Sequence, residues 1–108
     1  MVALIAAFAV IADAAAADAA GADAKATTHT IVIDGTAFVP SNLAVKRGDR
    51  VVWINKDPFP HTVTATDKSF DSGTIEAGKS WQLVLSRNGT LDYFCTLHPT
   101  MHGKLEVQ

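Results

Sequence analysis

From Thr28 to its end, the sequence consists of short apolar segments that alternate with turn residues. The segments are rich in β-branched and aromatic residues, as in Arg50–Asn55, and none repeats with the 3.6-residue period of an amphipathic helix. Gly35 and Gly48 each follow such a segment, and Asn88-Gly89 is a strong signal for a tight turn between two strands. Seven or so short strands with this spacing predict an all-β chain folded as an antiparallel Greek-key β-sandwich.

The residue pattern also indicates which side of some strands faces the core. Leu91, Tyr93 and Cys95 alternate with the polar Asp92, and apolar residues alternate in the same way over residues 80–85. Successive side chains of a strand point to opposite faces of the sheet. We therefore expect Leu91, Tyr93 and Cys95 to be buried on one common face.

The first 24 residues differ from the rest of the chain. Thirteen of them are alanine, and the run Met1–Ala12 carries no charge. This run is shorter than the ~20 residues that a membrane-spanning helix needs, and it has the length of the apolar stretch of an export signal. We therefore interpret residues 1–24 as an export-signal-like segment before a domain of residues 25–108, without a membrane span, that is periplasmic or otherwise exported. Because no basic residue precedes the run, an uncleaved Ala-rich extension is the alternative.

Charge and cysteine content exclude several classes of protein. All nine Lys and Arg residues lie from Lys25 onward, whereas three of the eleven acidic residues precede it, so residues 25–108 carry a net charge of about +1. A nucleic-acid-binding domain would present a strongly basic face. Cys95 is the only cysteine, so no disulfide can form within the chain, and a metal bond is one way to protect such a thiol in an oxidising compartment. We expect a monomer that binds no nucleic acid.

One short segment combines three metal-binding side chains in the pattern Cys-x-x-His-x-x-Met, namely Cys95, His98 and Met101. A fourth candidate ligand, His61, lies 34 positions before the cysteine and follows a loop stiffened by prolines. A thiolate, two imidazoles and a weak thioether form the ligand set that suits copper cycling between its two oxidation states. Zinc also accepts sulfur and imidazole, but a thioether is a poor zinc ligand, so the methionine favours copper.

At these residues the sequence resembles the cupredoxins, the blue-copper proteins, and within them most closely the amicyanin group. The resemblance extends over about residues 28–108 and is carried by the spacing of the Cys-x-x-His-x-x-Met segment together with Val52–Asn55, Pro60-His61, Asp92-Tyr93 and Gly103-Lys104. It implies a cupredoxin-like fold and one type 1 copper ion per chain. It further implies that His61, Cys95 and His98 are equatorial ligands and Met101 the axial one, with His98 as the partly exposed ligand through which electrons pass.

Two positions depart from the family pattern. Thr62 stands where the family usually has asparagine, and Leu97 where it commonly has proline. We expect the Thr62 backbone N–H still to reach the Cys95 sulfur, and a Thr62–Thr96 hydroxyl contact is one possible replacement for the asparagine. If the Leu97 N–H also points at sulfur, Leu97→Pro would lower the reduction potential.

Two further histidines stand outside the family's ligand pattern. His102 directly follows Met101, and we expect its imidazole to point away into solvent. His29 is expected at the exposed start of a strand.

The function that these features predict is that of a soluble exported electron carrier and not of an enzyme. No nucleophile–base arrangement stands out, and four ligands leave the metal no open position for a substrate. The resemblance implies an amine dehydrogenase as electron donor and a c-type cytochrome as acceptor. Exposed apolar loop residues would form the docking surface for such partners: Phe59, Pro60, Leu97, Pro99 and Thr100. Two alternatives stay open, a copper-binding carrier or buffer that uses the same ligands and a metal-free interaction module.

Overall fold

Residues 26–108 are described by the computed structural model, and the predicted export-signal-like segment, residues 1–24, lies outside them. Within the described residues, no helix has both the length and the apolar character needed to cross a membrane. The elements that the chain forms here are β-strands joined by turns and loops.

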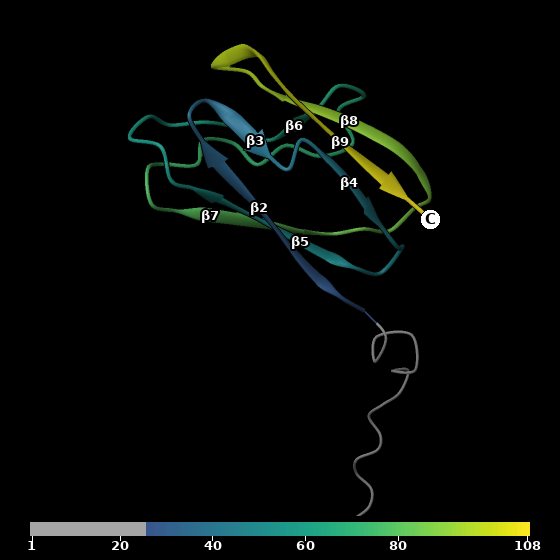
Figure 1. The fold of residues 1–108 in the computed structure, drawn as a ribbon. Helices are drawn as coiled ribbons and strands as arrows, with labels where there is room; N and C mark the ends of the chain where they lie inside the picture. The colour runs from purple at the N-terminus through teal and green to yellow at the C-terminus, as the bar shows by residue number, and fades with distance from the viewer. Residues whose placement is uncertain (1–25) are drawn as a thin grey trace, which may run out of the picture.

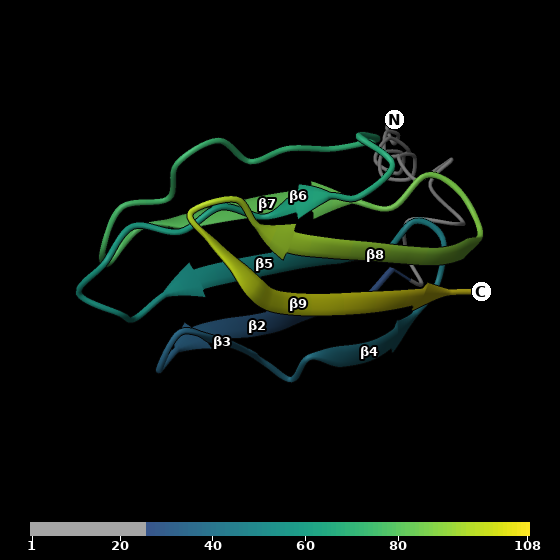
Figure 2. The ribbon, with the colours of Figure 1, turned by 90° about the horizontal axis from the view of Figure 1, so that it is seen from above.

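Eight strands form two four-stranded sheets that lie one above the other (Figure 1). The first sheet has the order β3-β2-β5-β7, and its strands are β2 (Thr28–Asp34), β3 (Ala37–Val39), β5 (Arg50–Asn55) and β7 (Ser80–Val84). The second has the order β4-β9-β8-β6, with β4 (Asn42–Val45), β6 (Thr64–Ala65), β8 (Gly89–Cys95) and β9 (His98–Val107). Seen from above, β8 and β9 run side by side (Figure 2). The expected all-β sandwich is confirmed.

Two strand pairs within this sandwich are parallel. Strand β2 pairs with β5 and strand β4 pairs with β9 in the parallel sense, whereas the other pairs are antiparallel. Parallel partners need a long connection. Here the connection from β2 to β5 includes β4 of the other sheet, and that from β4 to β9 includes β5 and β7 of the other sheet. Alternation of apolar residues along a strand is the same in both kinds of pair, so the sequence pattern does not distinguish them.

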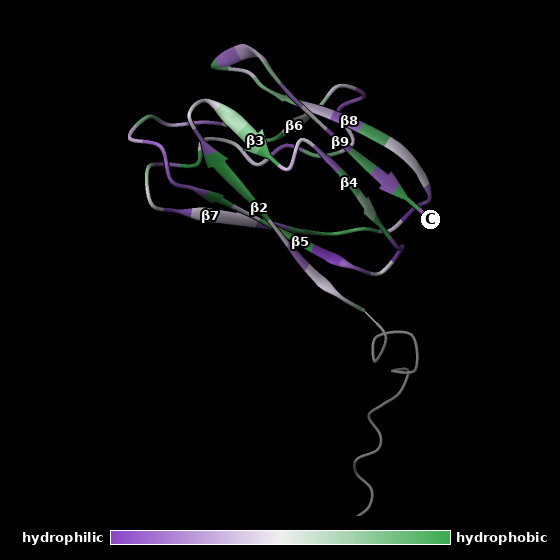
Figure 3. Cartoon of the chain, in the orientation of Figure 1, coloured by the Kyte–Doolittle hydropathy of each residue, from purple (hydrophilic) through white to green (hydrophobic). Residues whose placement is uncertain are grey.

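The core lies between the two sheets. Apolar and polar residues alternate along the strands (Figure 3), and Leu91, Tyr93 and Cys95 are buried on one face of β8 while Asp92 is exposed, as expected. The ring of Tyr93 meets that of Trp53 edge to face, with the centroids 5.5 Å apart. Such aromatic pairs contribute about 1 kcal/mol each beyond the area that they bury. Burial also raises the pKa of the Tyr93 phenol to about 12, so this residue stays neutral.

One strand is shorter than the β-branched composition of its segment predicts. In the segment Thr62–Thr66 only Thr64 and Ala65 form a strand, and Ile75 makes only an isolated bridge to His61. The Val63 N–H donates to the hydroxyl of Ser72 at 2.8 Å, so a side chain takes the place of a neighbouring strand. The β-branched composition of this segment does not reveal that a side chain takes the place of a neighbouring strand.

Asp49 joins the start of β2 to the turn before β5. Its carboxylate is 4% exposed and accepts hydrogen bonds from the N–H groups of Thr27 at 2.9 Å and Lys46 at 3.0 Å and from His29 Nε2 at 2.8 Å. The Thr27 N–H and the His29 side chain are the main causes that lower the pKa of Asp49 to about 2. His29, expected to be exposed, is therefore tied to a buried carboxylate at the start of its strand.

A first prediction concerns Gly103 on β9, which leaves room for the ring of Tyr93. A Cβ atom at this position would lie 2.2 Å from Tyr93 Cζ, closer than two non-bonded atoms can approach. We expect Gly103→Ala to lower the free energy of unfolding by about 3 kcal/mol, because the buried ring must move. Urea denaturation would measure this loss. In a Tyr93→Leu background the same glycine change should cost much less, and an equal cost there would contradict the explanation.

A second prediction concerns acid stability. The pKa of Asp49 is lowered in the folded state, so the stabilisation is complete above its usual value of 3.8 and is lost as the pH falls toward 2. Asp49→Asn should therefore flatten the fall in unfolding free energy between pH 5 and pH 2.5 by up to about 2 kcal/mol. Asp92→Asn, at an exposed position on β8, is the matched control. An unchanged pH dependence in Asp49→Asn would refute the assignment.

Candidate metal centre

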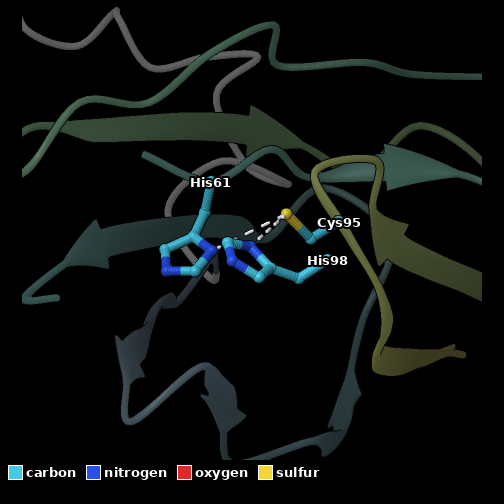
Figure 4. A group of neighbouring side chains, drawn as sticks. All are labelled: His61, Cys95 and His98. Carbon is cyan, nitrogen blue, oxygen red and sulfur yellow. Dashed lines mark hydrogen bonds between the residues drawn. The ribbon is translucent and has the colours of Figure 1, made fainter. Parts of the chain in front are cut away.

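Three of the predicted ligands converge near the end of β8 (Figure 4). His61 Nδ1 lies 3.6 Å and His98 Nδ1 3.9 Å from Cys95 Sγ, and the three potential donor atoms all lie within 4.8 Å of one another. His61 and Cys95 are fully buried, whereas His98 is partly exposed. Residues separated by 34 positions in the chain are thus brought into one cluster.

A tight hairpin with an irregular register positions the Cys95–Met101 segment. Cys95 pairs directly with His98 across a two-residue turn, whereas Phe94, one position earlier, pairs with His102. Residues 99–101 therefore have no partner on β8. Met101 lies in this unpaired stretch, is 4% exposed and belongs to the same buried cluster as Cys95. The bulge thus allows the cysteine, the histidine and the methionine of one short segment to lie at the same end of the sandwich.

The position of His61 is fixed by backbone hydrogen bonds to Ile75 and by the loop that precedes it. Its backbone N–H donates to the Ile75 carbonyl at 3.1 Å and its carbonyl accepts from the Ile75 N–H at 2.7 Å. Buried Asn55 donates through Nδ2 to the carbonyls of Phe59 at 2.8 Å and Ile75 at 2.9 Å, and its Oδ1 accepts from the Asp57 N–H. The Asn55 side chain therefore links both ends of the loop before His61 to the segment of Ile75, and it determines the position of His61.

Asp57 orients the imidazole of His61, a role that sequence reasoning missed. Asp57 Oδ2 lies 2.8 Å from His61 Nε2, and the carboxylate also accepts from the N–H groups of Gly35 and Thr36. Burial alone would raise the pKa of Asp57, but the donors Thr36, His61 and Gly35 together outweigh it and lower this pKa. An ionised Asp57 keeps the imidazole proton on Nε2, which leaves the Nδ1 lone pair facing sulfur. An acidic residue four positions before a candidate ligand histidine is the signal that could have indicated it.

Thr62 connects the His61 segment to the cysteine turn. Its backbone N–H donates to Cys95 Sγ at 3.3 Å, as expected, and its Oγ1 lies 3.2 Å from Thr96 Oγ1, which confirms the hydroxyl contact. Among residues 26–108, Thr62 supplies the backbone N–H that donates to sulfur, and Leu97 does not. The condition on which a lower reduction potential in Leu97→Pro depended, a hydrogen bond from the Leu97 N–H to sulfur, is therefore not met among these residues.

The surface beside the cluster is apolar. Phe59 is 54% and Leu97 is 50% exposed, and Pro60, Pro99 and Thr100 are exposed as well. These residues flank His61 and His98 in the chain, and the partly exposed His98 lies next to two of them. His29 and His102 do not belong to the cluster. His102 is exposed, with its ring centroid 6.4 Å from that of Phe94.

The separations between donor atoms fit a single metal ion. Metal bonds of about 2.0 Å to imidazole nitrogen and about 2.3 Å to thiolate sulfur are typical of such ligands. The sum of one bond of each kind, about 4.3 Å, exceeds the 3.6 Å and 3.9 Å between the sulfur and the two nitrogens, so one ion can bond to the sulfur together with either nitrogen. The soft sulfur, the two imidazole nitrogens and a buried thioether on the same segment match the donor set that copper prefers.

Known proteins resemble this chain over most of its length. A family model described as a cupredoxin-like domain matches residues 1–107. Amicyanin from Paracoccus denitrificans is 35% identical over 71 residues, which cover 61% of this chain and 54% of that protein. Amicyanin-alpha from Methylorubrum extorquens is 31% identical over 112 residues, which cover 98% and 94%. The chain thus spans about half of the first relative and nearly all of the second.

A solved structure gives the same result for the fold. It is the Cu(I) form of a methionine-to-alanine variant of amicyanin, and it superposes on this chain with a TM-score of 0.70 at 30% identity. The superposition covers 75% of this chain and 82% of the amicyanin chain. The two-sheet sandwich described above is therefore the fold of a protein that holds copper in that solved structure.

The role of Asn55 gives a third prediction. Asn55→Asp keeps the shape of the side chain but replaces two N–H donors by oxygen that faces the carbonyls of Phe59 and Ile75. We expect the free energy of unfolding to fall by about 3 kcal/mol at pH 7. The new carboxyl would have a raised pKa in the folded state, so the loss should shrink as the pH is lowered. Urea denaturation at pH 7 and pH 5 measures both effects.

The exposed Asn88→Asp serves as the control for this change of charge. A similar small loss in both variants would show that Asn55 does not hold the loop.

Proposed function

The chain belongs to the cupredoxin family, and from this premise we propose that it is an exported blue-copper electron carrier. In this proposal His61, Cys95, His98 and Met101 hold one type 1 copper ion. The observation that carries it is the convergence of two imidazole nitrogens and one buried sulfur within 4.8 Å, with Met101 buried on the same segment. When bound, copper supplies one-electron redox chemistry through its two oxidation states.

The surrounding residues keep the ligands in place during a change of charge. Asp57 fixes the orientation of the His61 ring, and Thr62 holds the sulfur through a backbone N–H. Both groups are at least nine-tenths buried, so they move little. Side chains that are already in position do not need to rearrange when an electron arrives, which favours rapid transfer.

His98 supplies the route between the cluster and the surface. Its ring is partly exposed, whereas His61 and Cys95 are fully buried, so an electron partner can approach His98 alone. Phe59 and Leu97 offer apolar area beside it, which suits the small interfaces of brief redox encounters. The partners are therefore redox proteins, with an amine dehydrogenase as donor and a c-type cytochrome as acceptor by resemblance to the amicyanin group.

An electron carrier of this kind performs no enzymatic step. Four protein ligands would leave the metal without an open position for a substrate. Residues 1–24 act as the export-signal-like segment in this proposal, and residues 25–108 form the copper-binding domain, which works as a monomer in the periplasm or an equivalent compartment.

The fourth prediction tests the copper site and its ligands. Addition of Cu(II) to the purified protein should produce an intense blue band that Cys95→Ser abolishes, because the colour requires a copper–thiolate bond. His29→Ala and His102→Ala are matched controls that should keep the band, since both residues lie outside the cluster. A protein that stays colourless with Cu(II) would contradict the proposal and favour a metal-free interaction module.

Voltammetry separates the electron carrier from a copper carrier or buffer. The copper-loaded protein should give a reversible one-electron response and should keep its metal against a weak chelator. Rapid loss of copper to that chelator, together with a slow or irreversible electrode response, would favour copper delivery instead.

A further inference from the structure

A row of hydroxyl groups leads from the cysteine turn to the protein surface. Thr96 Oγ1 lies 3.2 Å from Thr62 Oγ1, which lies 3.0 Å from Thr64 Oγ1. Thr64 Oγ1 in turn lies 3.1 Å from Oδ1 of the exposed Asp71. Thr62 Oγ1 also accepts a hydrogen bond from the Thr96 backbone N–H at 2.9 Å. The row therefore begins one residue after Cys95 and ends at a carboxylate in a loop after β6.

The charge at the outer end fixes the direction of every hydrogen bond in this row. An ionised carboxylate only accepts, so the Thr64 hydroxyl must donate to Asp71. Each hydroxyl has one proton, so Thr64 can then only accept from Thr62, and Thr62 can only accept from Thr96. Thr62 Oγ1 thus donates once and accepts twice, which uses its full hydrogen-bonding capacity.

This direction matters because Thr62 holds the cysteine turn at two points. Its backbone N–H donates to the Cys95 sulfur, and its hydroxyl oxygen accepts the N–H of Thr96, the next residue. Hydrogen bonds in a chain polarise one another, so donation toward a carboxylate makes the Thr62 oxygen a better acceptor for Thr96. The Asp71 side chain is itself held in place, because its Oδ1 accepts the Gly73 N–H at 3.0 Å.

We propose that Asp71 is a positioning residue for the Cys95–His98 turn, which it restrains through the directed hydroxyl chain of Thr64, Thr62 and Thr96. Its significance for electron transfer rests on the proposed function, whereas the hydroxyl chain itself does not. The three threonine hydroxyls and the Asp71 carboxylate together supply this restraint.

Amide hydrogen exchange of Thr96 tests the proposal directly, measured by NMR on the full chain in its diamagnetic Cu(I) form. Thr62→Val should speed this exchange by about fivefold or more, because the acceptor is lost. Thr64→Val and Asp71→Ala should each speed it by about twofold, since they weaken that acceptor without removing it. Thr64→Ser keeps the hydroxyl and should restore the original rate. The Lys104 amide, which donates to the Ser41 carbonyl, reports any general loss of stability.

Two controls separate the hydroxyl chain from other effects of Asp71. Asp67→Ala removes another carboxylate of the same loop, which accepts a hydrogen bond from the backbone N–H two residues later, as Asp71 does. This variant should leave the exchange rate of the Thr96 amide unchanged. Asp71→Ala in a Thr64→Val background should add nothing, because the link is already broken. An unchanged Thr96 rate in Asp71→Ala, or the same acceleration in both backgrounds, would overturn the proposal. Because Asp71 is exposed, this test does not depend on whether Thr62→Val folds.

The reduction potential gives a second readout in the copper-loaded protein. A less restrained Thr62 donates less well to sulfur, so Thr64→Val and Asp71→Ala should both lower the potential, and Asp67→Ala should not. If the reduction potential is unchanged in all three variants, Asp71 affects only the fold of its own loop, and this result would contradict the positioning role. If no blue copper site forms at all, the proposed function fails. The amide exchange rates of the copper-free protein then still test whether the hydroxyl chain restrains the Thr96 amide.

Discussion

The arrangement of the site depends on the position of one buried sulfur atom between two separate parts of the chain. Cys95 ends β8, whereas the imidazole beside its sulfur comes from the loop after β5. The Thr62 N–H bridges the two, because it follows His61 directly and donates to Sγ at 3.3 Å. This hydrogen bond helps to fix the separation of a cysteine sulfur and an imidazole that lie 34 positions apart in the chain.

Around this contact, buried polar groups hold His61 and the start of the turn that follows Cys95. Asn55, Asp57 and Thr62 are each at most 5% exposed, and each satisfies the backbone or side chain of a residue next to the cluster. Buried polar groups are costly unless they are paired, so their complete pairing favours one conformation of the loops. The apolar sandwich supplies the stability of the fold, and these few hydrogen bonds determine the geometry at its end.

Much of this arrangement could be predicted from the sequence, and the rest depended on contacts that no local pattern contains. The alternation of Leu91, Tyr93 and Cys95 indicated their common buried face, and the Cys-x-x-His-x-x-Met spacing indicated three ligands. The parallel pairs and the short β6 depend on which strands meet in space and were not predicted. Asp57 lies only four positions before His61, but the Gly35 and Thr36 N–H groups that hold its carboxylate lie far away in the sequence, and its role was missed.

X-ray absorption at the copper edge, recorded for the oxidised and the reduced protein, tests most directly whether a preformed pocket holds the metal. The account predicts one short bond to sulfur and two bonds to nitrogen, with nearly the same distances in both oxidation states. The loss of a ligand on reduction, or a spectrum without a sulfur neighbour, would contradict it.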